Sequence, residues 1–348
     1  MHTADNPAAQ WGQQFPQLRA QAIVDSNGMV WLPFDAANTQ QSPHQFSPLS
    51  ACYDQVCCAN RTSIDLDFGN IGRLLIINGF GLAFGDSVIG ITALHALLQR
   101  HPHLQVSLWR SSTCPAYVEA LYNYLPKSVS VTALPQPAER LAAFDAVIDL
   151  SDFLFWQSFN DLPMIDFFLH AIGLPYADIP AAEKANSWLA SIAPVHDWRR
   201  EFGDYVLFCP HASVALRSIP ERWHAPMVER LHAQFDLPVL GFANLDLPGY
   251  RNVSALSTTI AQWLDWVRHA QHVVSVDSAS IHLAAGFGIP STGYFVSIPP
   301  QLRTRDYPLC QSIWLDAQQR LTGLHESNVH DVIIYAESLW PEALKLTI

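Results

Sequence analysis

Short runs of apolar residues alternate with amphipathic segments along most of the chain, and this pattern predicts the fold class. Residues 74–77 and 272–276 are runs rich in Leu, Ile or Val, which is typical of strands buried in a parallel sheet. Each is followed by a segment with apolar side chains on one helical face. Such alternation predicts an α/β protein with doubly wound parallel sheets. The other predicted strands are 106–109, 129–133, 146–150, 205–209, 239–242 and 292–295, and the predicted helices are 87–100, 116–125, 163–171, 181–192, 225–235, 258–270 and one from about residue 280.

A break at Ala193-Pro194 divides this pattern into two similar halves. We expect an N-terminal domain over residues 61–195 and a C-terminal domain over residues 196–348, both Rossmann-like. In each half, polar loops follow the carboxyl ends of strands, where open α/β sheets bind ligands. We therefore expect the two domains to face a cleft that brings these loops together.

Residues 1–60 lie outside this alternation and predict an N-terminal extension containing a β-hairpin. Segments 22–24 and 29–32 are apolar and flank Asn27-Gly28, a pair that favours a type I′ turn. Residues 38–50 are polar and contain two prolines, which predicts loop or disorder.

Directly after the extension, apolar and acidic residues alternate over residues 64–68. Ile64, Leu66 and Phe68 would form the buried face of a strand, and Asp65 and Asp67 its wet face. This interpretation is favoured over a metal-binding Asp-x-Asp motif.

Composition and charge narrow the class of protein. A chain of 348 residues with 49% apolar and 14% charged residues can bury two domain cores. The net charge is −12, and only three of the 19 basic residues are lysine, which argues against nucleic acid and anionic lipid as partners. No run of about 18 apolar residues and no signal-like start are present, so we expect a cytoplasmic protein without an integral membrane segment.

The six cysteines agree with that expectation because they are scattered. Cys52, Cys57 and Cys58, with His44 upstream, form the one cluster, and its spacing matches no zinc signature. Reduced, partly buried thiols are the favoured interpretation, so we expect no metal and no cofactor. The role of the three clustered cysteines stays open.

The chemistry-bearing residues of the first half lie in the glycine-containing loop before helix 87–100. Asp86 stands at the joint between loop and helix, and Asn78 and Gly85 lie in the same loop. A dinucleotide fingerprint would need a third glycine where Phe84 stands, so a Rossmann cofactor site is disfavoured. Asp86 alone could simply cap the helix.

The second half carries polar residues in two places, the loop PHASVALRSIPERW after strand 205–209 and the start of the helix after strand 272–276. A helix N-terminus and guanidinium groups both bind anions. Arg303 and Arg305, after strand 292–295, could contact an anionic acceptor, but solvated surface charges are the favoured interpretation. Trp263 and Trp266 are interpreted as packing residues in preference to an acceptor platform. The candidate anion-binding residues are His211, Ser213, Arg217, Arg222, Asp277, Ser278, Ala279 and His282.

Three segments in order resemble the heptosyltransferases, glycosyltransferase family nine. FGDSVIGITALHALLQRHP resembles their Gly-Asp loop and helix, and DSASIHLAAGFGIPSTGYF is similar to their Asp-(Thr/Ser)-Gly-x-x-His-Leu-Ala-Ala segment. PHASVALRSIPERW resembles their nucleotide-side loop, with Arg217 in place of a lysine. The resemblance covers about residues 72–310 and leaves the extension out. Ala279 and His211 stand where the family has glycine, so the base and the sugar of the donor stay open.

This resemblance implies a GT-B fold and an inverting, metal-independent glycosyltransferase. The C-terminal domain would bind the diphosphate of a nucleotide sugar, with ADP-heptose as one candidate donor. Asp86 would be the catalytic base, with Asn78 and Gly85 on the acceptor side. The acceptor would be a glycan, a lipid-linked sugar or a protein. Two alternatives stay open, a sugar-nucleotide epimerase of similar fold and a non-catalytic nucleotide-sugar binding protein.

Overall fold

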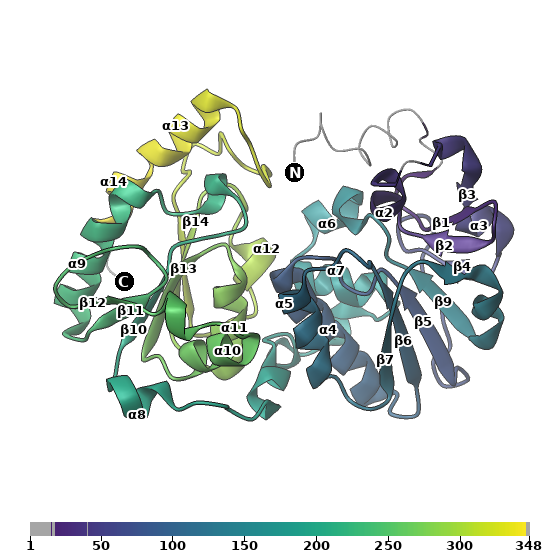
Figure 1. Ribbon diagram of the computed structural model, residues 1–348, viewed down its shortest axis with the longest axis horizontal. Coiled ribbons are helices and arrows are strands. Elements are labelled where there is room, and N and C mark those ends of the chain that lie inside the picture. The colour runs from purple at the N-terminus through teal and green to yellow at the C-terminus, as the bar shows by residue number, and fades with distance from the viewer. Residues whose placement is uncertain (1–14, 16–17, 40, 346–348) are drawn as a thin grey trace. The chain divides into compact units, whose positions relative to one another are not determined.

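The computed structural model describes residues 15, 18–39 and 41–345, and the chain forms two compact units (Figure 1). Unit 1 is Met1–Pro180 and unit 2 is Ala181–Ile348. Each unit has a parallel sheet with its own hydrophobic core, so the predicted α/β class is confirmed. The predicted cleft between the domains stays a prediction. No helix within the described residues is long and apolar enough to cross a membrane.

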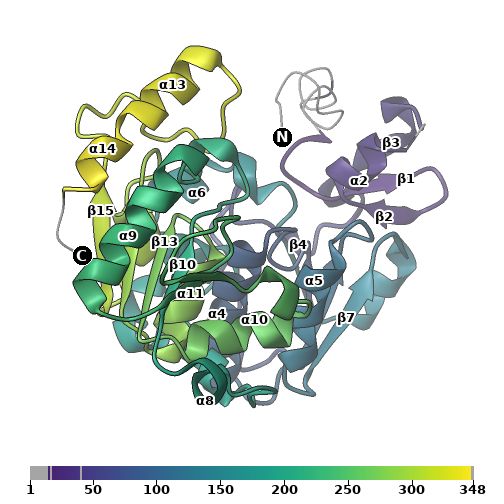
Figure 2. The same ribbon diagram turned by 60° about the vertical axis from the view of Figure 1, so that its left-hand side comes forward.

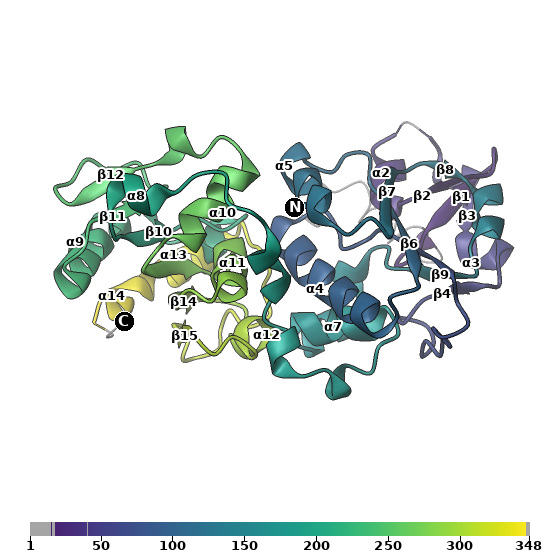
Figure 3. The same cartoon turned by 90° about the horizontal axis from the view of Figure 1, so that it is seen from below.

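Unit 1 is built on a parallel sheet that has five strands among the described residues. The long helix α4 (Phe84–Arg100) and α7 (Met164–Ala171) lie together on one face of this sheet (Figure 3). In spatial order its strands are β4 (Val56–Cys57), β9 (Ala146–Asp149), β5 (Arg73–Ile77), β6 (Gln105–Arg110) and β7 (Val129–Ala133).

The N-terminal extension covers the other face of that sheet with a small antiparallel sheet (Figure 2). Ala22, Val24 and Val30 from this layer share one buried core with Leu75 and Val147 of the parallel sheet. The extension is therefore a structural layer of unit 1. Its sheet has the order β3 (Phe46–Pro48), β1 (Ile23–Asp25), β2 (Met29–Trp31) and β8 (Gln136–Pro137), and its helices are α2 (Pro33–Ala37) and α3 (Leu49–Cys52).

A buried carboxylate ties the extension to the carboxyl end of β9. Asp149 Oδ2 accepts a hydrogen bond from the Ala22 N–H at 2.6 Å, and Oδ1 accepts one from the Ser151 N–H at 2.8 Å. Burial raises the pKa of Asp149 above its ordinary value, which these two N–H groups oppose. The extension is thus hydrogen-bonded at the sheet edge where ligands of α/β proteins bind.

Short helices complete unit 1 beyond these layers. The segment after β6 forms α5 and a 3-10 helix in place of one predicted helix. The short elements are α5 (Ala116–Glu119), the 3-10 helices Ala120–Tyr124, Ala138–Ala143, Phe153–Phe155 and Tyr176–Asp178, and α6 (Gln157–Asp161).

Unit 2 is built on a second parallel sheet, with six strands in the described part of the chain. Two groups of helices cover its two faces (Figure 1). On one face lie α9 (His224–Phe235), α13 (His330–Ser338) and α14 (Trp340–Ala343); on the other lie α10 (Ile260–Arg268) and α11 (Ala279–Phe287). The strand order is β12 (Tyr250–Asn252), β11 (Val239–Gly241), β10 (Val206–Cys209), β13 (His272–Val276), β14 (Ser291–Phe295) and β15 (Cys310–Trp314).

Residues 181–195, which were expected at the end of the N-terminal domain, belong to unit 2. They form the 3-10 helices Ala181–Glu183 and Ser187–Ser191, where we had expected one α-helix. Asn186 Nδ2 donates to the carbonyl of His282 at 3.0 Å, and Leu189 lies against Gly286. The segment therefore packs on α11.

Three local predictions about the extension and its neighbourhood were wrong. Only Gly28 of the hairpin pair has a positive φ, so the turn is not type I′; the Asp25 carboxylate instead accepts hydrogen bonds from the N–H groups of Asn27 and Met29. Residues 38–50 include β3, because Phe46 is buried and its strand pairs with β1. Residues 64–68 form no strand, although the apolar and acidic residues alternate as expected in exposure.

Candidate functional site

A buried ion pair joins the two polar segments of unit 2 at the carboxyl ends of β10 and β13. Asp277 follows β13 directly and is 4% exposed. Arg217 Nη1 donates to Asp277 Oδ2 at 2.8 Å and to its backbone carbonyl at 3.3 Å. Arg217 Nη2 donates to Ser213 Oγ at 2.9 Å. Three predicted residues therefore form one hydrogen-bonded cluster.

A second arginine, Arg303, lies on the other side of the same carboxylate. It belongs to the short helix α12 (Gln301–Thr304), its side chain is 4% exposed, and its Nε is 3.6 Å from Asp277 Oδ1. The prediction of a solvated surface charge was wrong for this residue. Burial opposes ionisation of Asp277, but Arg217 and Arg303 together hold its pKa below the ordinary value. Two guanidinium groups around one carboxylate leave a net positive charge, which attracts an anion.

The first turn of α11 adds backbone donors to this cluster. Ser278 occupies the N-cap position, but its side chain makes no capping hydrogen bond. Its Oγ lies 2.9 Å from Ser275 Oγ, which donates to the carbonyl of Cys209. Ala279 is the first helical residue. The leading N–H groups of α11 therefore receive no side-chain cap and can donate to a ligand.

His282 lies one turn into α11 and is 4% exposed. Its Nδ1 is 2.9 Å from the hydroxyl of Tyr307. Burial lowers the pKa of His282 to about 4, with the two arginines acting in the same direction and Asp277 opposing them. The ring is therefore neutral at pH 7, and it lies buried near Asp277 and the two arginines.

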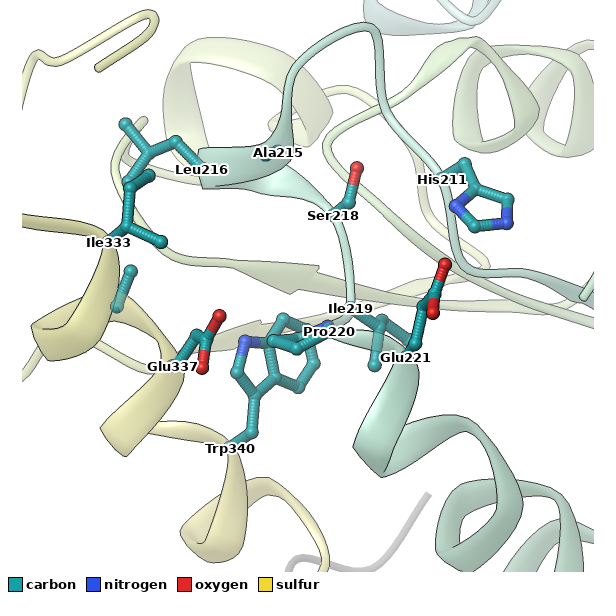
Figure 4. Close-up of a pocket in the computed structure, with 11 residues that line it drawn as sticks. His211, Ala215, Leu216, Ser218, Ile219, Pro220, Glu221, Ile333, Glu337 and Trp340 are labelled. Atoms are coloured by element: carbon teal, nitrogen blue, oxygen red, sulfur yellow. The ribbon is translucent and has the colours of Figure 1, made fainter. Parts of the chain in front are cut away.

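Arg222 and His211, two further candidates of unit 2, have neighbours other than the cluster around Asp277. Arg222 Nη2 lies 2.8 Å from Glu337 Oε2 of α13, and both side chains are substantially exposed. His211 is exposed, with its ring 5.3 Å from that of His224. His211 also lines a cavity of about 250 Å³ between the loop after β10 and α13–α14, together with Glu221, Glu337 and Trp340 (Figure 4). The loop thus presents Ser213 and Arg217 to Asp277, whereas Arg222 is directed to α13.

In unit 1, Asp86 lies in the first turn of α4 and is half-buried. Asn78 and Phe80 in the preceding loop have φ values of 57° and 66°. The Asn78 N–H donates to the carbonyl of Trp109 at 2.7 Å, and its Nδ2 donates to the carbonyl of Leu150 at 3.1 Å. Asn78 therefore shapes the loop by joining three neighbouring strands. Gly85 is the second residue of α4 and half-buried.

Packing of Phe80 explains the glycine at position 90 of α4. A Cβ atom at Gly90 would lie 2.1 Å from Cγ of Phe80, whose side chain is fully buried. The Phe80 ring thus packs the loop tightly against the helix that carries Asp86. The loop before Asp86 is held rigidly, as a preorganised site requires.

Solved structures are similar to this chain, whereas comparisons of its sequence find no match. The sequence matches no protein-family model, and no curated protein is similar to it in sequence. Among solved structures, the E. coli ADP-heptose lps heptosyltransferase II is similar with a TM-score of 0.50 and 15% identity, over 78% of this chain and 98% of that chain. A glycosyl transferase family 9 protein from Veillonella parvula DSM 2008 gives a TM-score of 0.49 at 13% identity, over 72% and 87% of the two chains. E. coli heptosyltransferase WaaC with ADP-2-deoxy-2-fluoro heptose gives 0.45 at 16%, over 69% and 92%.

At such low identities the likeness concerns the fold, and no residue role follows from it. The two parallel sheets match the GT-B structure of heptosyltransferase II over nearly its whole length. The structural similarity to glycosyltransferase family nine, expected from three sequence motifs, is confirmed, and the chain has the GT-B fold.

Proposed function

We propose that this protein is an inverting, metal-independent glycosyltransferase that uses a nucleotide diphosphate sugar. The cluster of Arg217, Asp277 and Arg303 beside the start of α11 carries this proposal. It combines a net positive charge, a hydroxyl from Ser213 and uncapped N–H groups at one strand end. A diphosphate needs this combination of donors.

The same cluster would promote departure of the nucleotide. When the bond between the anomeric carbon and the diphosphate oxygen breaks, the leaving group gains negative charge. Arg217, Ser213 and the N–H groups of residues 278–280 would stabilise that charge. Arginine thus takes the place that a divalent cation has in other transferases.

Asp86 would supply the base. The acceptor hydroxyl gives its proton to the Asp86 carboxylate while its oxygen forms the new bond to the anomeric carbon, and the diphosphate leaves from the opposite side. This single displacement inverts the anomeric configuration. The first turn of a helix favours the ionised carboxylate, the form a base requires.

The donor proposed first is ADP-heptose. The E. coli heptosyltransferase II, which shares this fold, carries ADP-heptose in its name. Donors with another base or sugar remain alternatives, because Ala279 and His211 stand at two positions where a glycine would allow closer backbone approach to phosphate.

Replacement of Asp86 tests the catalytic step. Asp86→Asn should lower sugar transfer at least about a hundredfold and change nucleotide affinity only a few-fold, because a general base acts in the chemical step alone. The assay can be hydrolysis of the nucleotide sugar, measured as the release of the nucleoside diphosphate. Asp65→Asn, an exposed carboxylate in the same unit, is the matched control. Unchanged turnover of the Asp86 variant would contradict the assignment.

Calorimetry with ADP in excess chelator tests the donor site. We expect binding to persist without divalent cations, because Arg217 and Arg303 already supply positive charge for the diphosphate. Arg217→Ala should weaken binding at least about tenfold, whereas Arg199→Ala, which removes an exposed arginine paired with Asp204, should leave it unchanged. A strict need for magnesium or manganese would point to another transferase class.

A further inference from the structure

An exposed aromatic ring lies against the first turn of α4, beside the proposed base. Tyr117 of α5 is 55% exposed. Its ring is nearly parallel to that of Phe84, with an interplanar angle of 21° and 6.4 Å between the centroids. Phe84 is buried and begins α4, two residues before Asp86. A large ring with free surface therefore lies on the first turn of the helix that carries Asp86.

A buried arginine holds the segment that carries Tyr117. Arg110, at the end of β6, is 2% exposed, and its Nε donates to Glu119 Oε1 of α5 at 2.7 Å. Its Nη1 also donates to the carbonyl of Gly79, in the loop before α4. One guanidinium thus joins α5 to the loop that precedes Asp86. Leaving this group buried without its partners would be costly, so the geometry is strongly specified.

Tyr122, in the 3-10 helix that follows α5, makes a second connection to the same loop. The Arg110 guanidinium carbon lies 3.7 Å from the centre of the Tyr122 ring. The Tyr122 hydroxyl is 3.0 Å from Ser87 Oγ and 3.1 Å from the Gly79 carbonyl. Ser87 is the neighbour of Asp86. The position of Tyr117 relative to Asp86 is therefore set by a fully hydrogen-bonded buried network.

Phe155, which follows strand β9 of the same sheet, is another exposed aromatic residue, but it differs in one respect. It is 42% exposed, but the guanidinium of Arg19 lies 4.7 Å from its ring centre and occupies one face. Tyr117 has no such cation on it among the described cation–ring contacts. Phe155 thus provides a matched control for ring exposure at the same edge.

We propose that Tyr117 is a stacking platform for a pyranose ring of the acceptor. A sugar ring that lies flat on an aromatic face brings its C–H groups against the ring and its hydroxyls to the side, within reach of a neighbouring base. The acceptor is then an uncharged saccharide, in agreement with the acidic, lysine-poor composition. This inference rests on the proposed function and specifies its acceptor class.

Saturation-transfer NMR with methyl glycosides of glucose, galactose and mannose tests the platform. At least one glycoside should receive saturation from the wild-type protein through its ring protons. Tyr117→Ala should weaken that binding about three- to tenfold, the range expected for one aromatic contact. Tyr117→Phe should retain it, and Phe155→Ala should match wild type. Because Tyr117 is exposed, its alanine variant should keep the wild-type melting temperature within a few degrees.

Two results would overturn the platform. One is that none of the three glycosides receives saturation from the wild-type protein, and the other is equal binding by Tyr117→Ala. Calorimetry with nucleoside diphosphates on the same variants separates this inference from the proposed function. Binding of a nucleoside diphosphate without glycoside binding removes the platform and leaves the donor site, whereas a wild-type protein that binds none of ADP, GDP, UDP and dTDP removes the transferase proposal itself.

Discussion

Asp277 shows how one residue can organise a site whose parts are far apart in the chain. Its carboxylate is the shared partner of Arg217, sixty positions upstream, and of Arg303, which follows the next strand. The strong pairing keeps Asp277 ionised in a buried place. Removing either arginine would lower the positive charge of the cluster and leave the Asp277 carboxylate poorly compensated, which is costly in a buried site.

The neutral state of His282 leads to a prediction about acid stability. Its pKa is about 4 in the folded protein and about 6.5 when exposed, so below pH 6.5 the unfolded chain binds more protons. Stability should be fully present above pH 6.5 and fall as the pH decreases toward 4. One pKa unit corresponds to about 1.4 kcal/mol, so the full loss from this ring is about 3 kcal/mol.

Urea unfolding of wild type and His282→Asn across this pH range measures the effect. Asparagine can still pair with the Tyr307 hydroxyl but does not titrate. Its unfolding free energy should therefore depend less on pH between 6.5 and 4. Parallel pH curves for the two proteins would show that His282 titrates normally.

Most residues of the cluster around Asp277 could be predicted to lie together from the sequence because they belong to loops that follow strands. Asp277, Ser213 and Arg217 lie in loops at strand ends, and parallel pairing of β10 with β13 brings those ends together. Arg303 could not be found this way. It lies on a helix of four residues, too short for a periodic pattern, and its burial depends on how the chain folds back over Asp277.

At the level of elements, long strands and helices were predictable and short ones were not. Strand β13 was predicted with its observed limits, because a buried strand followed by an amphipathic helix gives a clear pattern. Residues 64–68 alternate between less exposed and exposed positions, but they pair with no strand in the described part of the chain. Alternation alone therefore indicates exposure, whereas a strand also needs a partner.

The contact between α11 and the segment around Leu189 depends on the absence of a side chain at Gly286. A Cβ atom there would lie 2.5 Å from Leu189 Cδ1 and 2.6 Å from the Asn186 carbonyl oxygen. We expect Gly286→Ala to destabilise unit 2 by about 2 kcal/mol, because the clash with backbone exceeds the gain of about 1 kcal/mol in helix propensity.

Chemical denaturation followed by tryptophan fluorescence measures this loss, since Trp188 and Trp266 lie buried in unit 2. Ala285→Gly at the neighbouring position is the control for helix propensity alone, with an expected loss of about 1 kcal/mol. A Gly286→Ala protein as stable as wild type would mean that the 3-10 helix Ser187–Ser191 can move away from α11 without cost.

On the scale of the whole molecule, the two units share the same layered plan but differ in what covers their sheets. Unit 2 has helices on both faces, as the sequence pattern predicted. Unit 1 has α4 and α7 on one face and the antiparallel sheet of the extension on the other. The extension could not be placed from sequence, because its strand β2 pairs with β8, more than a hundred positions away, and nothing local indicates that partner.

Because each unit has its own core, a donor that binds unit 2 should stabilise that unit selectively. We expect calorimetry to resolve two unfolding transitions, with Gly286→Ala lowering only the one that belongs to unit 2. ADP at about a hundred times its Kd stabilises the folded state by roughly 2.7 kcal/mol, so it should raise the temperature of that same transition and leave the other unchanged.

Comparing ADP, GDP, UDP and dTDP in this way ranks the bases, and the largest shift identifies the base of the donor. A single transition raised by ADP would show that the units unfold together. If no diphosphate moves either transition and Arg217→Ala unfolds as wild type does with each of them, the arginine cluster does not bind a nucleotide and the proposed donor site is wrong.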